Sequence, residues 1–166
     1  TTCSSMEIQY VGVVSFTKNE LLQRFDFGES STKIMTLEQL CRNLPSELPV
    51  VFTNGFFDNI SAGHLKFLDQ LKTLKGFNVV GINSDSSIAE QKGELPLLNE
   101  RERALLLSAV EAVDRVVIFN ELDAGSMIRR IRPQIVVKGK RFLNKQLPEK
   151  KAIEDTGAKL EFFLEY

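Results

Sequence analysis

Several features that mark other classes of protein are scarce or missing from this sequence. The chain has only two cysteines, Cys3 and Cys41, and they form neither a metal-binding spacing nor a disulfide framework. Lys and Arg number 21 against 22 Asp and Glu, so no overall positive charge favours binding to nucleic acid or anionic lipid. No run approaches the ~20 apolar residues of a membrane helix, and no basic-then-apolar secretory signal opens the chain. These absences predict an intracellular protein, in the cytoplasm or an organelle interior, without membrane insertion.

The size and composition fit one folded domain. At 166 residues the chain is long enough to bury one sizeable core and too short for a second full domain. Apolar residues make up 43% and charged residues 26%, which is typical of globular proteins and too apolar for a disordered chain. The chain opens with Thr1 rather than Met, which fits either a removed leader or a piece of a longer protein.

From Val50 onward, short runs rich in β-branched residues alternate with amphipathic helical patterns. The runs predict strands at 50–52, 77–82, 115–119, 135–137 and 159–164. The helical patterns predict helices at 63–75, 100–113, 123–131 and 148–155, with Asp123 as the N-cap of the third. Strands that alternate with helices form βαβ units. The order therefore predicts an α/β fold, a Rossmann-like three-layer sandwich with a five-stranded parallel sheet.

The first part of the chain has a different pattern. Residues 8–16 are β-like, and capping-box patterns begin at Thr17 with Glu20 and at Thr36 with Gln39. We therefore divide the chain into an N-terminal arm or extension over 1–35 and a Rossmann-like domain over 36–166. The arm is expected to pack on the sheet or to take part in oligomerisation.

The segment between the first predicted strand and its helix, residues 53–64, carries the clearest chemical pattern. We expect Thr53-Asn54-Gly55 to form a turn, after which the helix directs its positive pole into the crevice at the carboxyl edge of the sheet. Anions bind at such helix N-termini. Gly63 and Gly55 would let the backbone approach a phosphate closely, and Ser61 and His64, the chain's only histidine, would place a hydroxyl and an imidazole over the first helical turn.

This segment resembles the (H/T)-x-G-H signature of the cytidylyltransferase-like nucleotidyltransferases. Its continuation resembles the sugar-phosphate branch, in particular heptose-phosphate adenylyltransferases and, more distantly, glycerol-phosphate cytidylyltransferases. The resemblance runs from Lys33 to Phe163. The motifs that carry it beyond the loop are Gly81-Ile82-Asn83-Ser84-Asp85, Lys92-Gly93, Glu102 with Ala109-x-Glu111-Ala112-Val113-Asp114, and Val136-Val137-Lys138-Gly139.

The resemblance implies transfer of a nucleoside monophosphate from ATP or CTP to a small phosphorylated metabolite, such as a sugar or polyol phosphate, with release of pyrophosphate. An acceptor oxygen attacks the α-phosphorus in line, and Mg²⁺ accompanies the triphosphate as the implied cofactor. Catalysis of this kind depends on positioning and on neutralising charge. The implied partners are the nucleotide and the metabolite, and the chain is expected to form a homodimer or to join a larger complex.

The same resemblance assigns roles to individual residues. His64, Ser61 and Lys92 are the implied catalytic residues, with His64 donating to the phosphates and Lys92 reaching in as a flexible charge. Nucleotide or phosphate binding is implied for Thr53, Asn54, Gly55, Phe56, Gly63, Lys138 and Gly139. Asp58 and Asp85 would position the loop or the acceptor, and no side-chain metal site is expected.

Several of these side chains also have a structural alternative, and a lone histidine such as His64 is often surface or core filler. Asp58 could bond turn amides, and Asp85 could cap its loop. Lys92 and Lys138 could be solvated surface charges, and for Arg103, at the start of a Glu- and Arg-rich helix, a structural ion pair is the favoured interpretation.

The sequence departs from the family pattern in four places. Ser61 stands where the family's first histidine is expected, although a hydroxyl residue occupies this position in some relatives. Leu95-Pro96 replaces Arg-Pro, and Lys140-Arg141-Phe142 replaces Gly-Asp-Tyr after the Lys-Gly pair. The chain ends at Tyr166, where the family supplies a Ser-Thr-Thr-type helix start. These departures support a second hypothesis, a catalytically degenerate homologue that serves as a nucleotide-binding or structural subunit.

Overall fold

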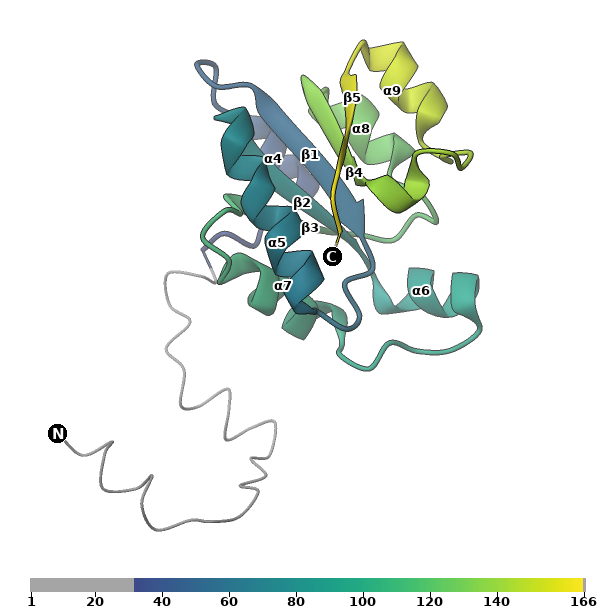
Figure 1. Cartoon of the computed structure of the whole chain (residues 1–166). Helices are drawn as coiled ribbons and strands as arrows, with labels where there is room; N and C mark the ends of the chain where they lie inside the picture. The colour runs from purple at the N-terminus through teal and green to yellow at the C-terminus, as the bar shows by residue number, and fades with distance from the viewer. Residues whose placement is uncertain (1–31, 166) are drawn as a thin grey trace, which may run out of the picture.

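Five parallel strands form the centre of the fold in the order β3-β2-β1-β4-β5, as the computed structural model shows for residues 32–165 (Figure 1). The strands are β1 (Val50–Gly55), β2 (Phe77–Asn83), β3 (Arg115–Phe119), β4 (Ile135–Gly139) and β5 (Lys159–Phe163). The pairings between neighbours are parallel throughout the sheet. The predicted five-stranded parallel sheet is therefore confirmed.

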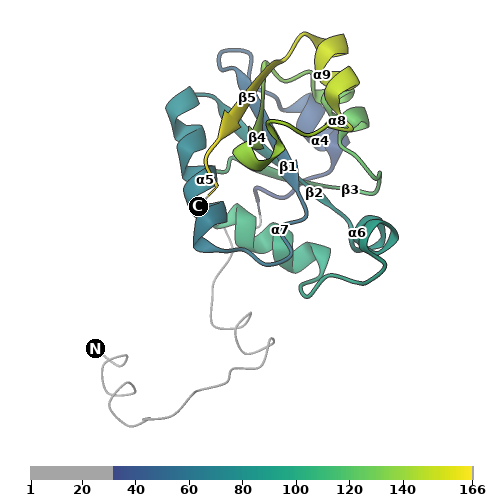
Figure 2. The ribbon, with the colours of Figure 1, turned by 45° about the vertical axis from the view of Figure 1, so that its right-hand side comes forward.

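Helices cover both faces of this sheet (Figures 1 and 2). One face is covered by α4 (Leu37–Arg42), α8 (Gly125–Ile131) and α9 (Lys150–Thr156). The other is covered by α5 (Ala62–Gln70), its 3₁₀ extension η1 (Leu71–Leu74) and α7 (Glu100–Ser108). The helix α6 (Asp85–Lys92) and the 3₁₀ turn η2 (Lys140–Phe142) follow the carboxyl ends of β2 and β4. The three-layer sandwich predicted from the sequence is confirmed.

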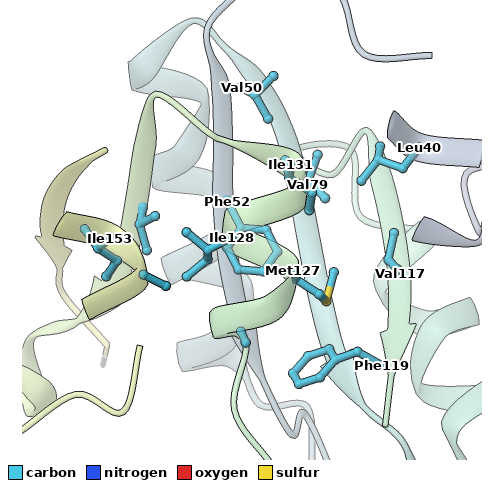
Figure 3. Close-up of a cluster of buried hydrophobic side chains, with 13 residues drawn as sticks. Leu40, Val50, Phe52, Val79, Val117, Phe119, Met127, Ile128, Ile131 and Ile153 are labelled. Atoms are coloured by element: carbon cyan, nitrogen blue, oxygen red, sulfur yellow. The ribbon is translucent and has the colours of Figure 1, made fainter. Parts of the chain in front are cut away.

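The two hydrophobic cores follow from the two-residue period of the strands. In β1, Val50 and Phe52 pack with α8 and α9, whereas Val51 packs with α5 and α7. Figure 3 shows Phe52 between Ile128 and Met127 of α8. A strand that is buried on both faces has no polar side, and the first half of β1, Val50-Val51-Phe52, accordingly appears in the sequence as an apolar run.

The prediction that Thr53-Asn54-Gly55 forms a turn is wrong. These residues continue β1, in which Asn54 pairs with Gly81 and Gly55 with Ile82 of β2. Asn-Gly has a strong turn tendency, but a paired neighbouring strand satisfies the backbone amides and outweighs that local preference.

Two predicted helix boundaries also need correction. The helix expected over 100–113 ends at Ser108, and beyond its end Lys33 donates from Nζ to the carbonyl oxygens of Val110 at 3.4 Å and Val113 at 2.8 Å. The expected N-cap Asp123 stands one residue too early: Ala124 is the N-cap of α8, and Asp123 Oδ1 accepts the Gly125 N–H at 2.7 Å. In both cases the prediction misplaced the end of a helix and not the helix itself.

The capping box predicted at Thr36 is confirmed. The Thr36 N–H donates to Gln39 Oε1 at 2.9 Å, and the Gln39 N–H donates to Thr36 Oγ1 at 3.2 Å, so that α4 begins at Leu37. Just before it, Ile34 bridges Val116 of β3. The pattern at Thr17 and the β-like run 8–16 lie outside the described residues, and the division of the chain after residue 35 stays a prediction.

Within residues 32–165, none of the helices combines the length and the apolar character needed to span a bilayer.

Candidate functional site

The order of the strands reverses between β1 and β4. From β1 the chain proceeds through β2 to β3 at one edge, whereas β4 and β5 lie on the other side of β1. The ladder between β1 and β4 joins Val51 to Ile135 and Phe52 to Val136, while β1 remains paired with β2 as far as Gly55. The carboxyl ends of β1 and β4 therefore flank a crevice, the usual ligand site of an open α/β sheet.

A cavity of about 580 Å³ occupies this crevice. Such a volume lies within the range of pockets that hold small organic ligands, roughly 300–1,000 Å³. The predicted site residues that line it are Thr53, Asn54, Gly55, Phe56, Asp58, His64, Lys92, Lys138 and Gly139. The other three, Ser61, Gly63 and Asp85, lie outside the lining. The fold thus gathers nine of the twelve residues, from four separate segments of the chain, around one space.

The N-terminus of α5 is closed by a reciprocal contact between Ser61 and His64. Ser61 is the N-cap, and its N–H donates to His64 Nδ1 at 3.2 Å. The hydroxyl of Ser61 lies 3.0 Å from the same ring nitrogen. Histidine here takes the N3 place that Glu or Gln holds in an ordinary capping box. The role of Ser61 in this structure is to hold the imidazole.

This contact determines the protonation of the imidazole. A backbone N–H can only donate, so Nδ1 of His64 accepts, and the proton of the neutral ring resides on Nε2. Burial lowers the pKa of His64, the positive charge of Arg141 lowers it further, and Glu165 acts in the opposite direction. At neutral pH the ring is therefore an uncharged Nε2–H donor in the cavity wall.

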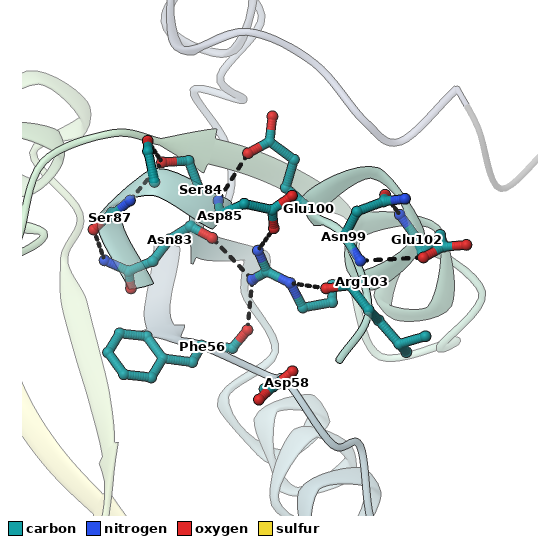
Figure 4. Close-up of polar contacts among 12 residues, drawn as sticks. Phe56, Asp58, Asn83, Ser84, Asp85, Ser87, Asn99, Glu100, Glu102 and Arg103 are labelled. Atoms are coloured by element: carbon teal, nitrogen blue, oxygen red, sulfur yellow. Dashed lines mark hydrogen bonds and ion pairs between the residues drawn. The ribbon is translucent and has the colours of Figure 1, made fainter. Parts of the chain in front are cut away.

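The buried guanidinium of Arg103 joins three segments around the cavity (Figure 4). It donates to the carbonyl oxygens of Phe56 at 2.7 Å, Asn83 at 2.8 Å and Leu98 at 3.0 Å. Its Nη2 also forms an ion pair with Asp85 Oδ1 at 2.7 Å. Arg103 has no solvent exposure, so the structural interpretation of this residue is confirmed. Asp85 lies in the first turn of α6 and has its charge paired there.

Lys92 and Asp58 meet at the mouth of the cavity. Lys92 is the last residue of α6, and its Nζ lies 3.8 Å from Asp58 Oδ2 and 5.0 Å from the centre of the Phe56 ring. Asp58 also accepts the Leu97 N–H at 2.6 Å, which ties the loop before α7 to the loop after β1. The ammonium of Lys92 remains partly exposed, at 39% for its side chain, and is thus available to an anion.

A buried polar cluster lies on the opposite side of the cavity from α5. Lys138 at the end of β4 donates from Nζ to Glu149 Oε1 at 2.7 Å and to Asn54 Oδ1 at 2.6 Å. Asn54 Nδ2 donates to the same Glu149 oxygen at 3.1 Å. Lys138 is thus not a solvated surface charge, since only 6% of its side chain is exposed.

The charges of this cluster compensate each other. Loss of solvent lowers the pKa of Lys138, and Glu149 opposes that effect. Burial acts to raise the pKa of Glu149, but the ammonium of Lys138 and the hydrogen bonds to the carboxylate together hold the pKa of this carboxyl below its ordinary value. Glu149 is therefore ionised at neutral pH and forms a salt bridge with Lys138.

Several residues of the cavity wall were not among the site residues predicted from the sequence. They are Phe57, Asn59, Phe67, Asn83, Gln91, Leu122, Asp123, Phe142, Leu147, Pro148, Glu149 and Glu165. Glu149 is the most informative of them, because it precedes a short helix with no motif around it and becomes part of the site only where α9 meets β4. Arg141, noted above as a departure from the family pattern, also lines the cavity and lies 3.3 Å from a carboxylate oxygen of Glu165.

Known proteins are similar to this chain in sequence. A family model described as cytidylyltransferase-like matches residues 52–162. The bifunctional protein HldE of Helicobacter pylori is 39% identical over 121 residues, which cover 72% of this chain and 26% of that protein. The bifunctional protein HldE of Geotalea uraniireducens is 38% identical over 138 residues, covering 80% of this chain and 28% of that protein. The chain thus spans just over a quarter of the length of these relatives.

Among solved structures, similarity extends to nearly the whole of one smaller protein. The lipopolysaccharide core biosynthesis protein from Thermoplasma volcanium superimposes with a TM-score of 0.60 and 26% sequence identity. The match covers 72% of this chain and 98% of that one.

Proposed function

Since this chain belongs to the cytidylyltransferase-like family, we propose that it transfers a nucleoside monophosphate from a nucleoside triphosphate to a small phosphorylated metabolite and releases pyrophosphate. The observation that carries the proposal is the N-terminus of α5, where His64 lines the cavity with Nδ1 held by Ser61 and Nε2–H left as a donor. A neutral donor at the positive pole of a helix suits a phosphate group.

The proposed reaction is one in-line displacement. A phosphate oxygen of the acceptor forms a bond to the α-phosphorus, the bond from that phosphorus to the bridging oxygen breaks, and pyrophosphate leaves with the electron pair. His64 would donate from Nε2 to the phosphate oxygens. Lys92 would neutralise part of the negative charge that develops on the leaving pyrophosphate. The buried contacts of Arg103 would keep the loop after β1 and the start of α6 in place, which supports the positioning on which such catalysis depends.

Mg²⁺ would enter with the nucleotide. Residues 32–165 contain no group of three or more His, Cys, Asp or Glu side chains that could hold a metal ion. Mg²⁺ usually binds through one or two carboxylates together with substrate phosphates and keeps several waters, so it needs no such group. When bound, the ion would neutralise part of the charge of the triphosphate. Asp58, which lines the cavity and lies 3.8 Å from Lys92, is a carboxylate that would be available to the ion.

For the substrates, we propose ATP and a sugar phosphate. The resemblance to heptose-phosphate adenylyltransferases supports both choices. The Thermoplasma volcanium neighbour is named a lipopolysaccharide core biosynthesis protein, which also supports a sugar-derived acceptor. Arg141 in the cavity wall supplies positive charge where the family pattern has an acid, and this charge suits the phosphate of an acceptor.

The test is release of pyrophosphate by the purified protein. The protein is incubated with ATP, CTP, GTP or UTP, Mg²⁺ and a panel of sugar and polyol phosphates that includes heptose phosphates. We expect release with one nucleotide and one acceptor class, and a loss of about 10²–10³-fold in His64→Ala, the typical cost of removing one such donor. Asp69→Ala, an exposed change on the same helix, serves as the matched control.

One outcome would favour the second hypothesis. No pyrophosphate release from any combination, together with no thermal shift from any nucleotide, would overturn the transferase proposal. It would favour a degenerate homologue whose Rossmann-like core is retained for folding or assembly.

A further inference from the structure

One oxygen of the buried carboxylate of Glu149 has no partner. Its Oε1 accepts from both Lys138 and Asn54, whereas Oε2 has no hydrogen-bond partner among the residues that the structure describes. The side chain is only 5% exposed, and the residue lines the cavity. Buried carboxylate oxygens are normally paired, because desolvation of an unpaired acceptor is costly. Glu149 Oε2 is thus a buried, unpaired hydrogen-bond acceptor on a residue of the cavity wall.

The charges nearby restrict what that ligand group can be. A phosphate is excluded at this oxygen, because the negative charge of Glu149 would repel it. A cation is disfavoured, because the ammonium of Lys138 already lies 2.7 Å from the other oxygen of the same carboxylate. The ligand group that suits Glu149 Oε2 is therefore an uncharged O–H or N–H donor.

The position of Glu149 relative to α5 indicates which part of a nucleotide would carry this donor. Phe52 and Val136 face α8 and α9, and Asn54 and Lys138 follow them by two residues, so their side chains lie on that same face. His64 belongs to α5, which covers the opposite face (Figure 2). A ligand with its phosphates at α5 would cross the carboxyl edge of the sheet to reach Glu149. Its uncharged nucleoside portion is the part suited to that side.

We propose that Glu149 is a specificity-determining residue that accepts a hydrogen bond on Oε2 from the nucleoside part of the substrate. The donor is a ribose hydroxyl or the exocyclic amine of the base, two sources of the same chemistry. Lys138 and Asn54 act as positioning residues, because their donated hydrogen bonds hold Oε1 and thereby aim Oε2. This inference rests on the proposed nucleotidyltransferase function.

Binding of nucleotide analogues to the wild-type protein tests the inference without any variant. Calorimetry with Mg²⁺ compares ATP with ITP, and CTP with UTP, since each second member carries an oxygen in place of the exocyclic amine. ATP is also compared with 2′-deoxy-ATP and 3′-deoxy-ATP. We expect the analogue that lacks the proposed donor to bind about 10- to 100-fold more weakly, the usual effect of a hydrogen bond to a charged group.

The variant Glu149→Gln then tests the residue itself. The amide oxygen must remain toward the donors of Lys138 and Asn54, so the amide NH₂ faces the cavity and an acceptor becomes a donor. We expect the discrimination seen in the wild type to disappear and, if the exocyclic amine is the donor, the preference between ATP and ITP to reverse. Glu154→Gln, an exposed change on the helix that follows Glu149, should keep the wild-type pattern.

The outcomes separate this inference from the function on which it rests. Equal binding of all the analogues to the wild type, or unchanged discrimination in folded Glu149→Gln, overturns the role of Glu149 and leaves the transferase proposal standing. Failure of every nucleotide to bind the wild type overturns both.

Discussion

The Ser61 N–H donates a hydrogen bond to Nδ1 of His64 at 3.2 Å, and this bond has both a structural and a chemical role. The contact completes the capping box of α5, and it also places the ring proton on Nε2. Because one hydrogen bond serves both purposes, protonation of His64 should disturb the helix end and the candidate site together.

Stability should therefore depend on pH through His64. Its pKa lies below the ordinary value near 6.5, so the unfolded chain binds a proton more readily than the folded one. Above about pH 6.5, titration of His64 should not change the free energy of unfolding with pH. As the pH drops from the pKa of the unfolded state to the lower pKa of the folded state, the free energy of unfolding should fall. Urea denaturation between about pH 5 and pH 7.5 measures this slope.

The variant His64→Gln provides the comparison. Glutamine keeps an acceptor at N3 of the capping box but does not titrate, and His64 is the only histidine in the chain. The slope attributed to His64 should be absent in this variant, while its stability at pH 7.5 stays close to wild type. An identical pH dependence of the free energy of unfolding in the two proteins would contradict the assignment of this effect to His64.

Lys92 should matter for turnover more than for stability. Its 3.8 Å contact with Asp58 involves partly exposed side chains, and such pairs contribute about 0–1 kcal/mol. In Lys92→Ala we expect kcat/KM for pyrophosphate release to fall about 10- to 100-fold, because a positive charge at the cavity mouth is lost. Lys72→Ala, which removes a lysine paired with Asp69 and Glu111 elsewhere on the surface, should leave kcat/KM unchanged. A large drop in stability with normal turnover would show that Lys92 is only structural.

Arg103 should be needed for folding stability. Its replacement by Met leaves three carbonyl oxygens and the carboxylate of Asp85 without their donor. Breaking a buried charged network of this kind costs about 3–5 kcal/mol, which urea denaturation would measure. Arg103→Lys should recover little, because one ammonium cannot reach the same acceptors. Arg101→Met, two residues earlier and exposed, should change stability by less than about 0.5 kcal/mol.

Gly81 in β2 should not tolerate a side chain. A Cβ atom at this position would lie 2.9 Å from Cζ of Phe52 and 3.4 Å from Cε1 of Phe119. Gly81→Ala should therefore destabilise the protein by about 1–3 kcal/mol through overpacking. The double variant with Phe52→Leu should recover part of this loss if the clash is the cause, and simple additivity in the double-mutant cycle would argue against it.

Local sequence patterns predicted the elements well wherever apolar residues form a clear run or stripe. The strand at 115–119 was predicted with the bounds that β3 has, because four of its five residues are apolar and favour strands. The helix α6 was missed, because its eight residues bury only Ser87 and Ile88 and show no apolar stripe. Both ends of α6 nevertheless carry residues that indicate a helix. Ser84 is the N-cap and accepts the Ser87 N–H, and Gly93 with φ 79° ends the helix.

The sequence by itself determined the α/β class, the number of strands and their positions along the chain, and the glycine-containing approach to a helix N-terminus that carries the only histidine. These depend on residue type and short spacing, which the chain encodes locally. Only the tertiary structure decided that Thr53–Gly55 extend a strand, that Arg103 is buried among carbonyl groups, and that Lys138 is paired with Glu149. Those outcomes depend on which distant segments meet at the edge of the sheet. Burial and pairing there set the hydrogen-bond partners and charges of side chains whose local sequence is uninformative.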